Sequence, residues 1–351
     1  MADISSSLPR TMRAAQVTGP AEIQVVDLPV PEPGPGQALI RVAVYAPYGT
    51  DIGVYLNRGG RYVKQYPVGI GADFSGVVAA VGEGVDNVKV GDRVSALALD
   101  HCGACRNCVA GRTNLCLDPA YAAPPRQSCC QEYTLVQARK LARLPDAVSF
   151  EDASMLAGLV DALNAYEKMG VRAGDTLAVV GVGSMGISAI AAARALGCEV
   201  VAIGGTGKRK EIASLMGARE VIGLARHGED VSAKALALMP EGFAYVIETT
   251  ASEWGLQQAF AIAGMDAAVA VTGGYNINLT GWDFVARELR VFGIRAGHHQ
   301  KQALDLIAEK RVDLKPTVAA RFTLEEAADA FALLTGDAAA DISRVLIRIS
   351  E

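Results

Sequence analysis

The chain has 351 residues, of which 51% are hydrophobic and 20% are charged, and its formal net charge is -5. This composition is that of a soluble globular protein, and the length favours two domains of about 100 to 200 residues each. A pI near 5.5 and the absence of a basic stripe argue against a nucleic-acid partner. The first ten residues lack the apolar core of a signal peptide, and no apolar run approaches the roughly 20 residues of a membrane span. We therefore expect a cytoplasmic protein with no membrane partner.

The first part of the chain is rich in short β-forming runs. From Met12 to about Val94, runs such as 38–44 and 76–81 alternate with Gly and Pro, and 131–136 has the same character. This pattern predicts a mostly β domain with many turns, which we place at residues 1–155.

Four cysteines lie close together within residues 100–117 of that domain. Cys102, Cys105, Cys108 and Cys116 form C-x2-C-x2-C-x7-C. Four thiolates at this spacing can surround Zn2+ tetrahedrally and leave no position for water or substrate, so the pattern predicts a structural zinc site. An iron–sulfur cluster and an unligated group of free thiols remain the alternatives. The other three cysteines show no ligand spacing, and we expect them to be small apolar residues.

Beyond residue 150 the pattern changes to alternating helices and strands. A helix is expected over 151–169, followed by short apolar strands that alternate with Ala-rich helices. The expected strands are Thr176–Val180, Glu199–Ile203, Val221–Ile222, Tyr245–Glu248, Ala268–Thr272 and Arg290–Gly293. Six such strands complete one doubly wound parallel sheet, so the fold class is α/β with this domain at residues 156–297.

Residues 298–351 are expected to return to the first domain. They contain two predicted helices, 301–310 and 324–334, and a last alternating strand, 343–349. Since this strand has no partner in the helical region, it should join the sheet of the first domain, which makes the α/β domain an insertion.

A glycine-rich turn follows the first strand of the α/β domain and opens a helix. The six residues of the turn are Gly181, Val182, Gly183, Ser184, Met185 and Gly186. In such a turn the first glycine allows the bend, the second lets a pyrophosphate approach the backbone, and the third lets helix and strand pack closely. The pattern predicts a dinucleotide site; a merely structural turn is the alternative.

The end of the second strand indicates which dinucleotide binds. An NAD enzyme places an acidic residue there, whereas this chain has Gly204, followed by Gly205, Thr206, Lys208 and Arg209. Without a carboxylate, a 2'-phosphate is not repelled, and a hydroxyl and two cations can donate to it. NADP is therefore favoured over NAD. The alternative is that the cations are only the solvated start of a helix, although cations there oppose the helix dipole.

Together these features resemble the medium-chain dehydrogenase/reductase superfamily, in its zinc-type alcohol dehydrogenase branch. The resemblance covers essentially the whole chain and rests on "VGEGVDNVKVGDRV" (81–94), the cysteine lobe, "AGDTLAVVGVGSMG" (173–186) and "LMGA" (215–218). It implies a GroES-like catalytic domain, a Rossmann NADP-binding domain, a small-molecule substrate and a homodimer built through the nucleotide domains. It also implies that Thr249 and Thr272 lie along the nicotinamide riboside.

The resemblance fails at the catalytic zinc. The family's three ligand positions correspond here to Tyr48, Ala72 and Ala157, which cannot form a zinc ligand set. The chain is thus similar to cinnamyl alcohol dehydrogenase-like reductases that have lost this metal. With no metal to polarise the substrate, Tyr48 becomes the candidate proton donor and Thr50 the relay hydroxyl.

The resemblance to the family also suggests secondary roles for several other residues. Asp51 and Asp73 match family positions around the lost ligands and could orient donors. Tyr48 could instead only fill the volume left by the zinc. His298 and His299 follow the last strand of the α/β domain and are expected to be a solvent-exposed pair.

The leading hypothesis is an NADPH-dependent reductase that delivers hydride to a conjugated C=C or C=N bond without a catalytic zinc. A zinc-independent carbonyl reductase or alcohol dehydrogenase is the alternative within the same chemistry. A non-catalytic NADP-binding protein is the alternative from another class.

Overall fold

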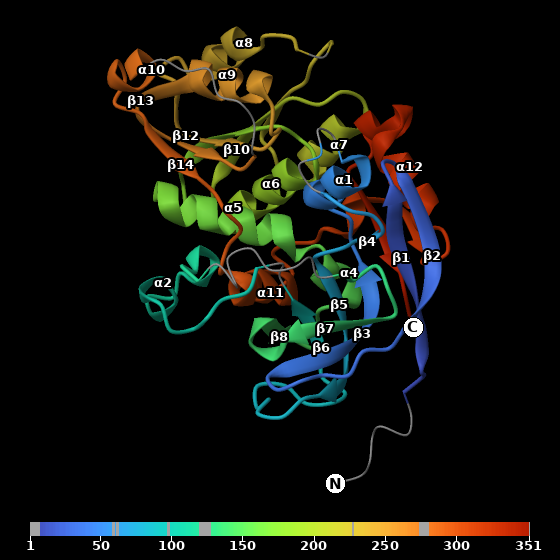
Figure 1. Ribbon diagram of the computed structural model, residues 1–351. Helices are drawn as coiled ribbons and strands as arrows, with labels where there is room; N and C mark the ends of the chain where they lie inside the picture. The colour runs from blue at the N-terminus through green and yellow to red at the C-terminus, as the bar shows by residue number, and fades with distance from the viewer. Residues whose placement is uncertain are drawn as a thin grey trace. The chain divides into compact units, whose positions relative to one another are not determined.

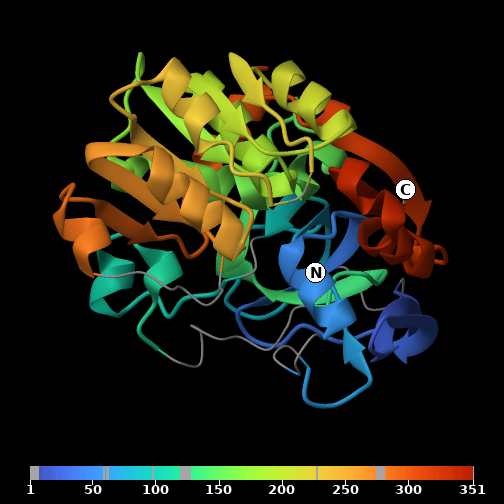
Figure 2. The ribbon, with the colours of Figure 1, turned by 90° about the horizontal axis from the view of Figure 1, so that it is seen from above.

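The computed structural model describes residues 8–57, 60, 63–96, 99–118, 128–226, 228–273 and 281–350, and is shown in two views in Figures 1 and 2. The chain divides into two compact units. The first comprises Met1–Leu156, Val318–Ala339 and Arg344–Glu351, and the second comprises Ala157–Thr317 and Ala340–Ser343. Within the described residues, no helix has both the length and the apolar character needed to cross a bilayer.

The first unit is mostly β. Its strands are β1 (Thr11–Gly19), β2 (Glu22–Pro29), β3 (Gln37–Tyr45), β4 (Val68–Gly69), β5 (Phe74–Val81), β6 (Arg93–Ala96), β7 (Tyr133–Gln137), β8 (Leu141–Arg143), β15 (Val318–Thr323) and β16 (Arg344–Arg348). Its α-helices are α1 (Gly49–Leu56), α2 (Arg106–Val109), α4 (Phe150–Ser154) and α12 (Ala327–Thr335). The short 3-10 helices of the chain are η3 (Thr113–Leu115), η4 (Ala138–Lys140), η5 (Lys315–Thr317) and η6 (Asp337–Asp341).

The strands of this unit form two sheets, and the larger one contains the end of the chain. Its order is β15-β16-β3-β5-β6-β8, with β7 also paired to β3, while the smaller sheet has the order β2-β1-β4. The last strand, β16, pairs antiparallel with β3 and parallel with β15. The expected return of the final strand to the first sheet is thus confirmed.

The second unit contains one parallel sheet. Its strands are β9 (Thr176–Val180), β10 (Glu199–Ile203), β11 (Glu220–Ile222), β12 (Phe243–Glu248), β13 (Ala263–Val271) and β14 (Arg290–Gly293). Its helices are α5 (Leu156–Met169), α6 (Ser184–Ala195), α7 (Lys208–Leu215), α8 (Ser232–Leu238), α9 (Glu253–Ile262), α10 (Gly281–Val285) and α11 (Gln300–Ala308).

The strand order of this sheet is β11-β10-β9-β12-β13-β14, and every neighbouring pair is parallel. The order reverses between β9 and β12, so the helices cover both faces, as Figure 1 shows for α9 on one side and α5 and α6 on the other. Strands buried on both faces are continuously apolar, which explains why β9 and β10 were placed correctly from the sequence.

Local structure differs from the sequence-based expectation in two places. The helix expected over 151–169 is two helices, α4 and α5, because α4 is a short capped helix that ends at Met155. Its cap is Ser149, whose hydroxyl accepts from the Asp152 N–H at 3.2 Å. Helix α1 was not expected at all, since its eight residues follow directly on a β-rich run.

The expected boundary between residues 297 and 298 also differs from the division in the structure. Residues 298–317 belong to the second unit, because α11 buries Ala303, Leu304, Leu306 and Ile307 there. Arg311 also donates to the carbonyl of Ala195 in α6. The chain returns to the first unit only at Val318.

Candidate functional site

The glycine-rich turn between β9 and α6 has the geometry of a phosphate-binding loop. Gly181 has φ +103°, which only glycine adopts without strain. A Cβ on Gly186 would collide with the carbonyl oxygen of Gly181, so this glycine allows the helix to approach the strand. A Cβ on Gly183, the N-cap of α6, would meet nothing within 4 Å. This open space lies at a helix N-terminus, where unsatisfied N–H groups favour an anion.

The turn borders a cavity of about 350 Å3 in the second unit. Eight predicted cofactor residues line it, namely Gly181, Val182, Gly183, Gly204, Gly205, Thr206, Arg209 and Thr249. The other five, Ser184, Met185, Gly186, Lys208 and Thr272, are not among its described lining residues. The sequence analysis missed six lining residues, namely Leu224, Gly228, Thr250, Ser252, Trp254 and Ala340. They lie after β11, after β12 and near the end of the chain, so only the folded chain brings them to the turn.

The backbone at the end of β10 disfavours a simple acidic substitution. Gly204 has φ +117° and Gly205 has φ +78°, and both values disfavour an L side chain. A Cβ on Gly205 would in addition collide with the side chain of Val182. Replacing Gly204 with Asp, the obvious way to favour NAD, would therefore strain the backbone as well as change the charge.

Arg209 and Lys208 have different environments. Arg209 is half-buried and lines the cavity, and its guanidinium donates to the carbonyl of Ile342 at 2.7 and 3.2 Å. Burial lowers the pKa of Arg209, and attraction to Asp341 partly offsets this effect. Lys208 is exposed, and its backbone N–H donates to Asp341 Oδ1 at 3.1 Å. Of the two predicted phosphate-binding cations, Arg209 is therefore the one that faces the cavity.

The two predicted nicotinamide-side threonines are held against the sheet. The Thr249 hydroxyl donates to the carbonyl of Val180 at 2.9 Å, and the Thr272 hydroxyl donates to that of Glu248 at 2.9 Å. Both lie at the carboxyl ends of central strands, the edge at which doubly wound sheets bind ligands.

Three of the four predicted catalytic residues of the first unit, Tyr48, Thr50 and Asp51, lie at the start of α1. Tyr48 is the N-cap residue and is half-buried, and its backbone N–H donates to Asp51 Oδ2 at 2.9 Å. Asp51 is 3% exposed and Thr50 is exposed. Asp73 is also buried, directly before β5. The carboxylate of Asp51 thus fixes the backbone that carries the Tyr48 side chain.

A residue that the sequence analysis missed lies near Tyr48. Arg344, the first residue of β16, is fully buried, and burial lowers its pKa to about 10. Attraction to the ionised form of Tyr48 opposes this shift in the pKa of Arg344, so the guanidinium lies near enough to the phenol to act on its charge. A guanidinium in a low-dielectric site stabilises negative charge on a neighbouring phenol oxygen. No motif could have linked two residues that are almost 300 positions apart.

The residues at the family's catalytic zinc positions do not fit a zinc ion. A phenol and two alanine methyl groups provide neither a thiolate, an imidazole nor a carboxylate. Among the described residues, groups of three or more converging His, Cys, Asp or Glu ligand atoms occur at two places, and neither includes Asp51 or Asp73.

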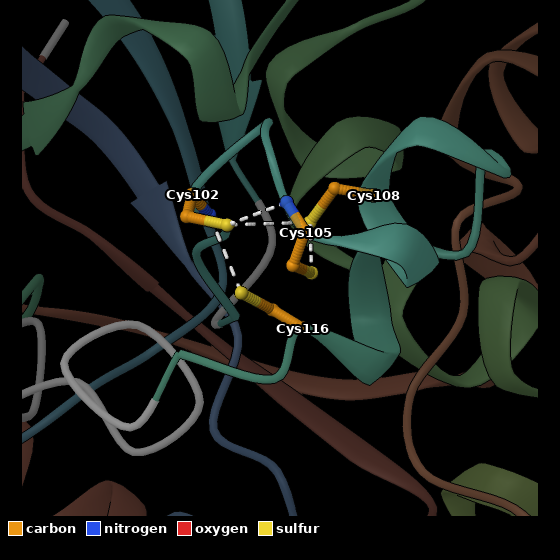
Figure 3. Close-up of side chains that lie close together, drawn as sticks. All are labelled: Cys102, Cys105, Cys108 and Cys116. Atoms are coloured by element: carbon orange, nitrogen blue, oxygen red, sulfur yellow. Dashed lines mark hydrogen bonds between the residues drawn. The ribbon is translucent and has the colours of Figure 1, made fainter.

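The four predicted structural zinc ligands do converge, as Figure 3 shows. Their sulfur atoms all lie within 4.8 Å of one another, and the Cys105–Cys108 and Cys102–Cys108 separations are 3.4 and 3.9 Å. Sulfurs about 2.3 Å from a tetrahedral zinc are about 3.8 Å apart, so the group fits the ion.

Backbone N–H groups in this lobe favour thiolates. Ala104 and Cys105 donate to Cys102 Sγ at 3.4 and 3.3 Å, and these bonds lower the pKa of Cys102. The N–H of Leu117 makes the largest contribution to lowering the pKa of Cys105, to about 6. The lobe is a structural zinc site with four cysteine ligands. As expected, the three other cysteines, Cys129, Cys130 and Cys198, are buried free thiols.

Comparison with known proteins places both units in one family. Residues 34–146 match the alcohol dehydrogenase GroES-like domain, and residues 181–309 match the zinc-binding dehydrogenase domain. The chain is 30% identical over 334 residues to the sorbitol dehydrogenase of Bacillus subtilis (strain 168), covering 93% of this chain and 94% of that protein. It is 30% identical over 319 residues to the L-threonine 3-dehydrogenase of the same strain, covering 88% and 91%.

Solved structures agree with this assignment. A putative zinc-binding dehydrogenase from Sinorhizobium meliloti 1021, bound to NADP, is 26% identical and superposes with a TM-score of 0.85, covering 97% of this chain and all of that one. The 2R,3R-butanediol dehydrogenase of Bacillus subtilis is 25% identical with a TM-score of 0.84 and the same coverage. With a GroES-like unit and a Rossmann-type unit, the chain belongs to the zinc-type alcohol dehydrogenase family of medium-chain dehydrogenases/reductases and is an NAD(P)-dependent oxidoreductase.

Proposed function

We propose that this protein is an NADP(H)-dependent alcohol dehydrogenase or carbonyl reductase that acts on a small hydroxylated substrate. The observation that carries the proposal is the near full-length similarity to enzymes named for the dehydrogenation of sorbitol and L-threonine. Reduction of a conjugated C=C or C=N bond, our leading sequence-based hypothesis, has no counterpart in the names of these relatives. We therefore prefer the alternative, in which a C–OH group and a C=O group interconvert.

In the proposed reaction the residues of α1 handle the proton. The residues around the glycine-rich turn would hold the dinucleotide, which would supply hydride exchange with the carbon of the reacting C–OH or C=O group. The Tyr48 hydroxyl hydrogen-bonds to the substrate oxygen, donates its proton in reduction, and takes it back in oxidation. Thr50, exposed on the first turn of α1, exchanges that proton with solvent. Positive charge on Arg344 stabilises the transient phenolate.

Preference for NADP over NAD is a separate part of the proposal. It is supported by the absence of a carboxylate at Gly204 and by Thr206 and Arg209, which line the cavity. The solved structure of the Sinorhizobium meliloti relative contains NADP, which agrees with a preference for NADP in this protein. A guanidinium is well suited to a phosphate because it offers planar paired donors.

A homodimer formed through the second unit is also proposed. Strand β14 is the last strand of the six-stranded sheet, and exposed apolar side chains lie around this edge. They are Met265, Trp282, Val285 and Val291. A grouping of this kind is typical of a protein–protein interface.

The reaction class is tested by following NADPH absorbance with a panel of compounds. The panel contains polyols and β-hydroxy amino acids with NADP+, and hydroxyketones, saturated ketones and enones with NADPH. We expect turnover of the alcohols and ketones. Turnover of enones alone would restore the conjugated-bond hypothesis, and no turnover with any compound would indicate a non-catalytic binding protein.

Cofactor preference is tested by Arg209→Gln, with Lys208→Gln as its matched control. A hydrogen bond to a charged group contributes about 1.5 to 3 kcal/mol, so we expect the KM for NADPH to rise about 10-fold or more. The KM for NADH should change little in R209Q, and neither KM should change much in K208Q. Equal weakening of NADPH and NADH in R209Q would refute the phosphate-binding role.

A further inference from the structure

Two histidines and a glutamate of the second unit meet at a place that the proposed reaction does not use. Glu167 lies in the last turn of α5, and His298 and His299 lie between β14 and α11. His298 is exposed, as expected from the sequence, whereas His299 is half-buried and its side chain is only 11% exposed.

The three side chains converge on a small volume. His299 Nε2 is 2.9 Å from Glu167 Oε2, and His298 Nε2 is 3.7 Å from the same oxygen. The imidazole rings lie 4.2 Å apart, with an interplanar angle of 35°. One ligand atom from each residue lies within 4.8 Å of the other two. Ligands about 2.1 Å from a tetrahedral ion are roughly 3.4 Å apart, so small side-chain rotations would close the group on a metal.

The chemistry of the group favours a cation between the rings over a simple His–Glu ion pair. The Nδ1 atom of His299 is buried and has no hydrogen-bond partner among the described residues. An ion pair uses one imidazole, whereas here a second imidazole is held against the same carboxylate, where two positive rings would repel each other.

We propose that Glu167, His298 and His299 form a second metal site, which takes one divalent transition-metal ion such as Zn2+. Two imidazoles and one carboxylate are a ligand set that zinc accepts, and three protein ligands leave a position for water or a small anion. The site shares no residue with the four-cysteine lobe or with the positions that the resemblance assigns to the family's catalytic zinc. The ion would join the end of α5 to the segment after β14, two elements that lie far apart in the sequence.

The test uses the full-length protein with its four-cysteine site filled. After dialysis against a moderate chelator, Co2+ is added and followed by visible absorption, and Zn2+ is followed by calorimetry. We expect about one additional equivalent of metal, with the weak absorption of cobalt bound to nitrogen and oxygen and without thiolate-to-cobalt charge transfer. Cobalt that exchanges into the four-cysteine lobe would show that charge transfer.

Variants assign the additional metal to the site. Glu167 is 59% exposed on a helix surface, so Glu167→Gln should fold normally and weaken Zn2+ binding about 10-fold or more. His298→Ala combined with His299→Ala should abolish the added equivalent. His227→Ala, at a histidine outside the described residues, and Glu309→Gln, in an exposed turn, serve as matched controls and should bind as the unmodified protein does. Unchanged binding in E167Q and in the double variant, or no added equivalent in the unmodified protein, would overturn the proposal.

Discussion

At the scale of single residues, the environment of Tyr48 is the most informative feature of the first unit. The residue caps α1, its backbone is held by the buried carboxylate of Asp51, and its side chain interacts with the buried Arg344. A tyrosine that only filled space would need none of these polar neighbours. The surroundings therefore support a role in proton transfer.

Removal of the Tyr48 hydroxyl should test that role directly. A positioned acid or base contributes about 100-fold or more to the rate, so we expect Tyr48→Phe to lower kcat by at least that factor. The KM for NADPH should be unchanged. The basic limb of the pH–rate profile should disappear, which a purely space-filling phenol would not produce. Tyr133→Phe, at a half-buried tyrosine in β7, is the control and should retain full activity.

At the scale of elements, the glycines of the turn between β9 and α6 are required for different reasons. Gly186 allows the close approach of helix and strand, whereas Gly183 faces open space with an ordinary φ of -77°. Adding a methyl group at Gly183 should therefore affect cofactor affinity, whereas adding one at Gly186 should also affect stability, although the two positions are only three residues apart.

We predict that Gly183→Ala folds with a stability within about 0.5 kcal/mol of the unmodified protein, because alanine adopts this φ without strain. Its affinity for NADPH should fall about 10-fold or more, since the methyl group occupies the approach of the pyrophosphate to the backbone. Gly186→Ala should instead lose about 1 to 3 kcal/mol of stability through overpacking, together with affinity. Denaturant unfolding and fluorescence titration with NADPH measure the two quantities. Equal loss of stability in both variants would contradict this division.

At the scale of the whole molecule, the two C-terminal strands are held in the first unit by one carboxylate. Glu151 in α4 accepts two hydrogen bonds from Arg321 of β15, at 2.9 and 2.8 Å, and two from Arg348 of β16, at 3.2 and 2.7 Å. These interactions, chiefly the hydrogen bonds from Arg321, lower the pKa of Glu151 to about 2. These ion pairs join strands β15 and β16 to Glu151, which lies more than 160 positions earlier in the chain.

Because the folded-state pKa of Glu151 lies below its ordinary value of 4.5, its contribution to stability is complete above about pH 4.5 and is lost as the pH falls towards 2. We expect Glu151→Gln to lower the free energy of unfolding by about 1 to 2 kcal/mol at pH 7, after allowance for solvent screening. The difference from the unmodified protein should shrink through that acid range. Glu325→Gln is the control, since its ion pair with Arg13 is 3.6 Å long and exposed. A difference that did not depend on pH would show that Glu151 acts through packing.

The proposed dimer leads to a second prediction for the whole molecule. Val285→Asp and Val291→Lys place charges on the apolar edge beside β14, where desolvating them would oppose association. Light scattering after size exclusion should show a shift towards monomer. Leu238→Lys, at an exposed apolar residue of α8, should leave the dimer intact. A monomeric unmodified protein would refute the dimer at the outset.

The sequence by itself determined the features that depend on local pattern and short spacing. Strands β9, β10 and β14, the glycine turn and the four cysteines were placed correctly because periodicity, backbone freedom and ligand spacing are properties of consecutive residues. Only the tertiary structure brought Arg344 to Tyr48, Trp254 to the nucleotide cavity and Glu167 to the histidine pair. These contacts join positions far apart in the chain, and their free energy depends on burial and on distances that no local pattern contains. The break between α4 and α5 and the position of residues 298–317 were likewise decided by capping and packing.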